Sequence, residues 1–157
     1  MAGPTSPLLR TDAQPRVEYR QFLLADHESL PEFPGGWKGS SRVLVEGDRG
    51  ILFRTAGNDF YPDVRIEVWS SEPHLPQDQP WDVIEEAAIV SQTGRIGLRE
   101  WDHSPKGELL QLGSPGNYRL RAHCRGRAEA TARSAQDMYY EGVEEWLLQI
   151  WPIAPSD

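Results

Sequence analysis

The side chains that most often perform catalysis or bind metals are sparse in this chain, and their spacing gives them no common site. There are four histidines, and they form neither a His-x-His nor a His-x-x-x-His pair, the spacings that would place two imidazoles on one face of a strand or helix. The tightest polar cluster, Trp101-Asp102-His103, is typical of a turn. The sequence therefore predicts no metal site.

The single cysteine and the paired carboxylates also give no catalytic centre. Cys124 falls on the apolar side of a strand pattern, which predicts a buried thiol rather than a nucleophile. The pairs Glu85-Glu86 and Glu144-Glu145 are adjacent in sequence, and successive side chains of a strand point to opposite faces. We find neither a glycine-rich phosphate loop nor a Gly-x-Ser-x-Gly motif. We therefore expect no catalytic residue and no cofactor, and a chain that is not an enzyme.

Charge is distributed unevenly along the chain. The 157 residues hold 16 Lys and Arg against 24 Asp and Glu, and the net charge of −8 is atypical of a nucleic-acid-binding domain. Eight of the acidic residues lie between Asn58 and Val90, where Arg65 is the one basic residue. Complementary charge speeds association and excludes wrong partners, so this stretch predicts a surface for a basic protein.

Aromatic residues are interleaved with these acids, as in many binding hot spots. Val64, Ile66 and Val68 alternate toward a core, so Trp69 is expected to face outward. The predicted partner-binding residues are Asp59, Phe60, Tyr61, Asp63, Glu67, Trp69, Trp81 and Asp82. In the alternative interpretation, the acids form solvated faces and the aromatic side chains pack in the core.

A strand with four positive or polar side chains on one face follows Gly116-Asn117. Its apolar face carries Tyr118, Leu120, Ala122 and Cys124, and its other face carries Arg119, Arg121, His123 and Arg125. The arginines could bind a phosphate or carboxylate group, or they could pair with acids on a neighbouring strand.

Short apolar runs divided by glycine and proline predict the fold class. Ser41–Glu46 and Ile51–Thr55 flank Gly47-Asp48-Arg49-Gly50 and predict a hairpin. Val83–Ser91 has a helix-favouring centre, but its length and its end at Thr93-Gly94 favour a strand. Residues 126–142 favour a short helix or a loop. We predict an all-β, antiparallel, jelly-roll-like β-sandwich with eight or nine short strands and at most one short helix.

The chain length and composition predict a single domain with an arm. Residues 1–15 are rich in proline and small polar residues and are expected to form a flexible N-terminal arm, followed by one β-sandwich domain over residues 16–157. A single cysteine excludes an intramolecular disulfide. We find neither an apolar run of about 20 residues nor a signal-peptide pattern, so a cytoplasmic protein is expected.

Several strand and turn motifs resemble those of a known family. Glu18-Tyr19-Arg20-Gln21-Phe22 resembles an opening strand, Ile51-Leu52-Phe53-Arg54 a middle strand, and Pro115-Gly116-Asn117-Tyr118-Arg119-Leu120 the turn into a penultimate strand. Glu144 to Trp151 occupies the place of the last strand. In order and spacing, residues 16–151 are similar to the competence protein J family, small acidic β proteins that inhibit a nuclease of DNA uptake. The segments 1–15, 71–80 and 126–133 depart from that pattern.

The resemblance implies a non-catalytic, protein-binding inhibitor or immunity-type protein that docks a basic partner, a nuclease or toxin. It assigns no inhibitory residue to a numbered position, and it implies binding neither to nucleic acid nor to a membrane. The alternatives are a jelly-roll module for a carbohydrate or another small molecule, with Trp37, Trp69, Trp81 and Trp101 as stacking platforms, or a subunit of a larger assembly or homo-oligomer. The partner, the strand order, the oligomeric state and any ordering of the arm on binding stay open.

Overall fold

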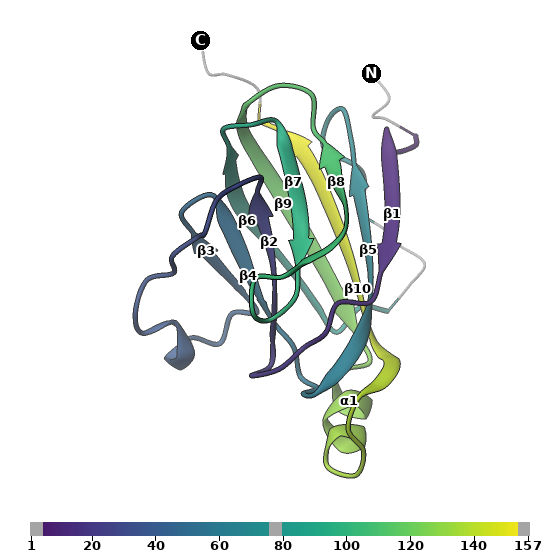
Figure 1. The fold of residues 1–157 in the computed structure, drawn as a ribbon. Coiled ribbons are helices and arrows are strands. Elements are labelled where there is room, and N and C mark those ends of the chain that lie inside the picture. The colour runs from purple at the N-terminus through teal and green to yellow at the C-terminus, as the bar shows by residue number, and fades with distance from the viewer. Residues whose placement is uncertain (1–4, 76–79, 154–157) are drawn as a thin grey trace.

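The computed structural model describes residues 5–75 and 80–153, which form a sandwich of two five-stranded sheets (Figure 1). The sheet with the longer strands, here the long sheet, has the order β1 (Leu9–Ala13), β5 (Phe60–Val68), β10 (Tyr140–Pro152), β9 (Gly116–Arg125) and β6 (Val83–Ser91). The short sheet has the order β3 (Leu44–Gly47), β4 (Gly50–Arg54), β2 (Gln21–Asp26), β7 (Arg95–Arg99) and β8 (Pro105–Gln111). The described residues also hold the helix α1 (Arg127–Ser134) and one 3-10 turn, η1 (Trp37–Gly39). The predicted all-β sandwich is confirmed, with somewhat more strands than the sequence suggested.

The two sheets are antiparallel except at the centre of the long sheet. There β5 and β10 pair in parallel, while every other neighbouring pair in both sheets is antiparallel. A parallel pair needs a long crossover, and β6 to β9 supply it between these two strands. The predicted hairpin is present as β3 and β4, which pair through Gly47 and Gly50.

The core lies between the sheets and is built by strict alternation on the long strands. Val64, Ile66 and Val68 on β5 are buried, as predicted, and so are Tyr118, Leu120, Ala122 and Cys124 on β9. At the centre, the rings of Phe22 and Phe53 stack with centroids 4.8 Å apart, and Trp146 meets both edge-on. Close packing of three large rings fixes the spacing between the two sheets.

The predicted flexible arm contains an ordered strand. Leu9–Ala13 forms β1, which pairs with β5 from Leu9 beside Val68 to Ala13 beside Val64. The segment has no apolar pattern that would predict a strand, because only Leu8 and Leu9 are large and apolar there, and both are exposed. The segment is ordered by backbone hydrogen bonds to the edge of β5 and not by burial of its side chains. Residues 1–4 of the arm lie outside the described residues.

Two ambiguous segments are settled by the structure. Val83–Ser91 forms a strand, β6, because its pairing with β9 over nine residues outweighs the helix propensity of its centre. The segment after β9 forms the eight-residue helix α1, which lies at one end of the sandwich, here the α1 end (Figure 1). No helix within the described residues is long and apolar enough to cross a membrane.

Candidate protein-binding surface

Five of the predicted partner-binding residues lie along the outer face of the long sheet, in two separate groups. Asp63, Glu67 and Trp69 belong to β5 or follow it directly, whereas Trp81 and Asp82 precede β6 at the opposite edge. The strands β10 and β9 lie between the two groups. With strands about 4.8 Å apart, the groups are separated by roughly 14 Å. The acidic segment therefore does not fold into one continuous acidic patch.

The carboxylates of β5 accept hydrogen bonds from this chain's own side chains. Glu67 Oε1 accepts from Trp69 Nε1 at 3.0 Å and from Gln149 Nε2 at 3.1 Å. Asp63 Oδ1 accepts from Gln14 Nε2 at 2.7 Å but remains exposed. Glu67 thus joins the side chains of Trp69 and Gln149 on the outer face, while Asp63 stays accessible to a partner.

The arginines of β9 pair with acids of neighbouring segments, which confirms the structural interpretation of that strand. The salt bridges join Arg119 to Glu86 (3.9 Å), Arg121 to Glu72 (3.1 Å) and Glu86 (3.3 Å), and Arg125 to Glu145 (2.6 Å). These acids lie on β6, on β10 and in the segment that follows β5. Part of the charge asymmetry seen in the sequence is therefore neutralised across the sheet.

Two of the predicted aromatic contacts are wrong. Phe60 has no exposed surface, because it packs in the core against Tyr140 with ring centroids 5.1 Å apart. Trp69 is only 8% exposed, although it lies on the outer face. The segment that follows it turns back over this face, where Pro73 accepts a hydrogen bond of 2.9 Å from Arg121 Nη1. Alternation alone could not reveal that the outer face is covered.

The same cover produces a small secondary core on the outer face. Trp81 is half-buried, with its ring 5.3 Å from that of His123 and 4.8 Å from the guanidinium of Arg125. Trp151 lies 5.0 Å from the guanidinium of Arg121. His123 is fully buried, and burial, reinforced by the positive charge of Arg121, holds its pKa below the usual value. The rings of Trp81 and Trp151 thus pack against this chain's own side chains.

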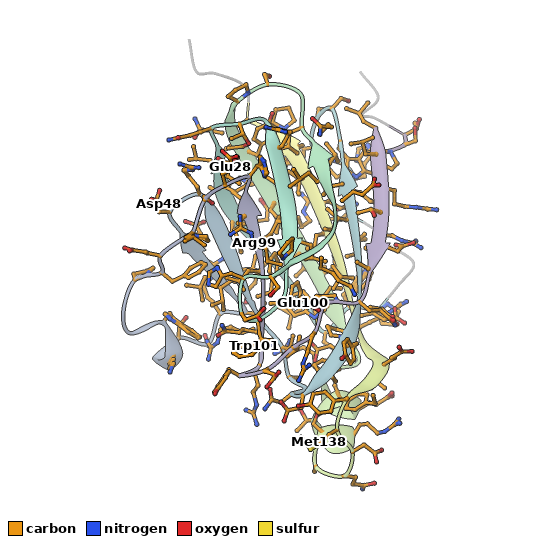
Figure 2. The ribbon with its side chains drawn as sticks, viewed as in Figure 1. Glu28, Asp48, Arg99, Glu100, Trp101 and Met138 are labelled. Carbon is orange, nitrogen blue, oxygen red and sulfur yellow. The ribbon has the colours of Figure 1, made fainter. Side chains whose placement is uncertain are left out.

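Exposed apolar side chains instead gather at the α1 end. Tyr19 is 75% exposed, Met138 63% and Tyr139 42%. The ring of Tyr19 lies 5.4 Å from that of Trp101, which is half-buried. Figure 2 shows Trp101 and Glu100 on the side of the sandwich toward Met138. No sequence pattern predicts this group, because its members come from three loops far apart in sequence.

Arg16 ties these loops to one another. Its backbone oxygen accepts from the Trp101 amide at 3.2 Å, and its own amide donates to Glu100 Oε2 at 2.6 Å. Its guanidinium donates to the Tyr139 hydroxyl at 3.2 Å and lies 4.7 Å from the centre of that ring. The Tyr139 amide in turn donates to the backbone oxygen of Asp59. The exposed aromatic rings are therefore carried by loops that are linked to each other.

Five of the eight described non-glycine residues with positive φ, a conformation that is rare for residues with side chains, lie in the same place. Tyr19, Arg20, Asp59, His103 and Tyr139 all have φ between 48° and 71°. Each such residue costs about 1–3 kcal/mol, and strain of this kind is concentrated at functional sites. The predicted residue Asp59 thus belongs to the α1 end, and Tyr61, which is half-buried beside Glu141, adjoins it.

The buried titratable groups near the core are inaccessible to a substrate. Cys124 and Glu144 have no exposed surface. Burial raises the pKa of both, and the charge of Glu144 raises that of Cys124 further. Glu144 accepts from the amides of Ala56 at 2.9 Å and Gly57 at 3.0 Å, so it fastens the loop between β4 and β5. Within residues 5–75 and 80–153, no group of His, Cys, Asp and Glu side chains could hold a metal ion.

Comparison with known proteins supports the fold. No protein-family model matches the chain, and no curated protein matches it significantly. Among solved structures, the chain is similar to ComJ from Bacillus subtilis, an inhibitor of the DNA-degrading activity of NucA, with 15% identity, a TM-score of 0.64, and coverage of 94% of this chain and 97% of ComJ. It is also similar to crocagin biosynthetic gene J, with 18% identity, a TM-score of 0.55, and coverage of 97% and 99%. The protein has a ComJ-like fold over nearly its whole length.

Proposed function

We propose that this chain is a non-catalytic protein that binds another protein and inhibits it, and that the α1 end is its docking surface. The observation that carries the proposal is the exposure of Tyr19, Met138 and Tyr139 on two loops that Arg16 links to each other. Aromatic side chains held in place before binding lose little conformational entropy on association, which makes them effective anchors. The shared fold with a nuclease inhibitor supports an inhibitory role.

Four acidic residues lie around this surface, together with the cations Arg16 and Arg20. Asp59 and Asp63 at the start of β5, Glu141 on β10 and Asp102 after β7 surround the exposed aromatic residues, and the last three are exposed. Negative charge around an apolar centre favours a partner with a basic surface and accelerates its association. A nuclease must present such a surface to the phosphates of DNA. A basic nuclease or nuclease-like toxin is therefore the partner that we propose.

The experiment uses the tagged full chain as bait in its native cells, with a Tyr19→Ser/Met138→Ser double variant as a matched control. We expect wild type to retain a nuclease that is released as salt rises, and to abolish its DNA cleavage at equimolar ratio. The double variant should lose both effects while keeping its melting temperature. The proposal fails if wild type does not inhibit any nuclease that it captures, or if the variant inhibits equally well.

A further inference from the structure

A cavity of about 480 Å³ opens at the α1 end on the side of the short sheet. Its walls come from the loop 37–43, the end of β4, the turn at Tyr19 and Arg20, and the first turns of α1. This volume lies within the range of about 300–1,000 Å³ that is typical of small-molecule sites. The cavity takes no part in the docking surface proposed above, apart from Tyr19 at the shared border.

The lining of the cavity is strongly basic. No Asp or Glu side chain lines it. The lining includes five cationic side chains: Arg20, Lys38, Arg42, Arg54 and Arg127. The remainder consists of apolar and hydroxyl-bearing residues, with Trp37 among them. Such a concentration of positive charge contrasts with the net charge of −8 of the whole chain.

Two of these cations are neutralised by acids behind the cavity wall. Arg42 Nε lies 3.3 Å from Glu85 Oε1. Arg127 Nη1 lies 3.6 Å from the buried carboxylate of Glu144. Their charges are therefore largely balanced within the protein, and they contribute hydrogen-bond donors more than net charge.

The other three cations have no such counter-charge. Arg54 donates to the backbone oxygens of the loop, at 2.7 Å to Ser40 and 3.0 Å to Arg42, which holds the loop without neutralising the guanidinium. Lys38 Nζ lies 5.8 Å from the ring centre of Trp37. Within residues 5–75 and 80–153, no salt bridge joins Arg20, Lys38 or Arg54 to a carboxylate. Three uncompensated positive charges thus share one concave space.

Like charges gathered in a cavity repel one another, and a bound anion removes that repulsion. Guanidinium groups match the geometry of phosphate oxygens and bind them through paired hydrogen bonds. We propose that this cavity binds a small ligand that carries two or more phosphate groups. The multiple charges of such a ligand match the three uncompensated cations, and the cavity volume leaves room for an organic part beside Trp37.

The test is a calorimetric titration of the full chain with sodium pyrophosphate, at about 20 mM and about 150 mM NaCl. We expect binding of one pyrophosphate per chain, with an affinity that falls as salt rises. An Arg20→Gln/Lys38→Gln variant should lose at least about tenfold in affinity, because two of the three uncompensated charges are removed. The control is Arg10→Gln/Arg95→Gln, which removes two charges from exposed positions outside the cavity and should leave the affinity within about twofold.

Three results would overturn the proposal. The first is the absence of pyrophosphate binding at millimolar concentration in low salt. The second is an equal loss of affinity in the control variant, because this would indicate diffuse attraction rather than a site. The third is binding of a single-stranded oligonucleotide through Arg20 and Lys38 when pyrophosphate does not bind. This result would show that the cavity binds a nucleic-acid backbone and not a small ligand. No protein partner is present in this titration, so its outcome is independent of the inhibitor function.

Discussion

Ser91 Oγ on β6 donates a hydrogen bond of 2.7 Å to Asp26 Oδ1 on β2, so a buried polar contact joins the two sheets at the end opposite α1 (Figure 1). Asp26 has no exposed surface, yet its carboxylate also accepts from the Gln92 amide at 2.9 Å and pairs with Arg49 at 3.1 Å. Burial acts to raise the pKa of Asp26, but hydrogen bonds from Ser91, Thr93 and nearby amides outweigh it and lower the pKa.

We expect Asp26→Ala to lower the free energy of unfolding by about 3 kcal/mol, because it leaves several donors and Arg49 without their shared acceptor. The contribution of the carboxylate is present above the pKa of an unfolded Asp and is lost as the pH falls through the lower pKa of the folded state. Urea denaturation at neutral and acidic pH measures both effects. Asp48→Ala, at an exposed position, should change stability by less than about 0.5 kcal/mol. Equal losses in the two variants would contradict this role.

The proposed docking surface predicts a selective loss of affinity. Tyr19→Ser and Met138→Ser each remove an exposed apolar side chain at the α1 end, and together they should weaken partner binding by at least about 2 kcal/mol. Because neither side chain is buried, the melting temperature should stay unchanged. Leu8→Ser/Leu30→Ser removes side chains that are 64% and 78% exposed elsewhere, and should leave affinity unchanged. Titration calorimetry with the captured partner measures the affinity of each double variant. Equal weakening in both variants would show that the α1 end is not the interface.

Substitution of Gly126 tests how tightly the backbone packs between β9 and α1, and Gly107 on β8 serves as its control. Gly126 has φ +79°, and a Cβ at this position would collide with the backbone oxygen of Val143. Gly107 has nearly the same φ, +77°, but open space around it. We expect Gly107→Ala to cost about 1 kcal/mol, which is the backbone term alone. Gly126→Ala should cost at least about 2 kcal/mol more, because the contact forces β10 or α1 to shift. Chemical denaturation of both variants gives the difference, and a difference near zero would show that the backbone here moves freely.

The sequence predicted the fold well where alternation is long and local. Val64, Ile66 and Val68 face the core as expected, and so do the alternate residues Tyr118, Leu120, Ala122 and Cys124, because β5 and β9 are both interior strands with one apolar face. The edge strand β1 could not be foreseen, because it is ordered by backbone pairing with β5 and not by an apolar pattern. The parallel pairing of β5 with β10 likewise depends on chain topology, which spacing does not encode.

The predicted site was less accurate for a related reason. The run of acids from Asp59 to Glu86 predicts one surface, but two strands separate its halves, and arginines of β9 pair with two of its acids, Glu72 and Glu86. Trp69 illustrates the second error, since the irregular segment that follows β5 covers a face that alternation marks as outward. The exposed group at Tyr19 and Met138 has no sequence signature, because its members meet only through the contacts of Arg16 and its neighbours.

His123 provides the last prediction, which concerns stability between neutral and mildly acidic pH. Its ring is fully buried beside Trp81, its Nδ1 lies 3.2 Å from the backbone oxygen of Leu147, and its Nε2 has no partner among the described residues. Burial and the nearby Arg121 lower its pKa, although Glu67 acts in the opposite direction. The folded protein therefore resists protonation of this ring.

Below the usual histidine pKa of about 6.5, the unfolded chain binds a proton that the folded chain does not bind, so the free energy of unfolding falls as the pH is lowered. We expect wild type to lose more stability than His123→Gln when urea denaturation is compared between about pH 7 and about pH 5.5. His74→Gln, at an exposed position, should follow wild type. Should His123→Gln show the same pH dependence as wild type, the secondary core around Trp81 would have to admit a charged imidazole, and the cover over the outer face would be looser than its contacts indicate.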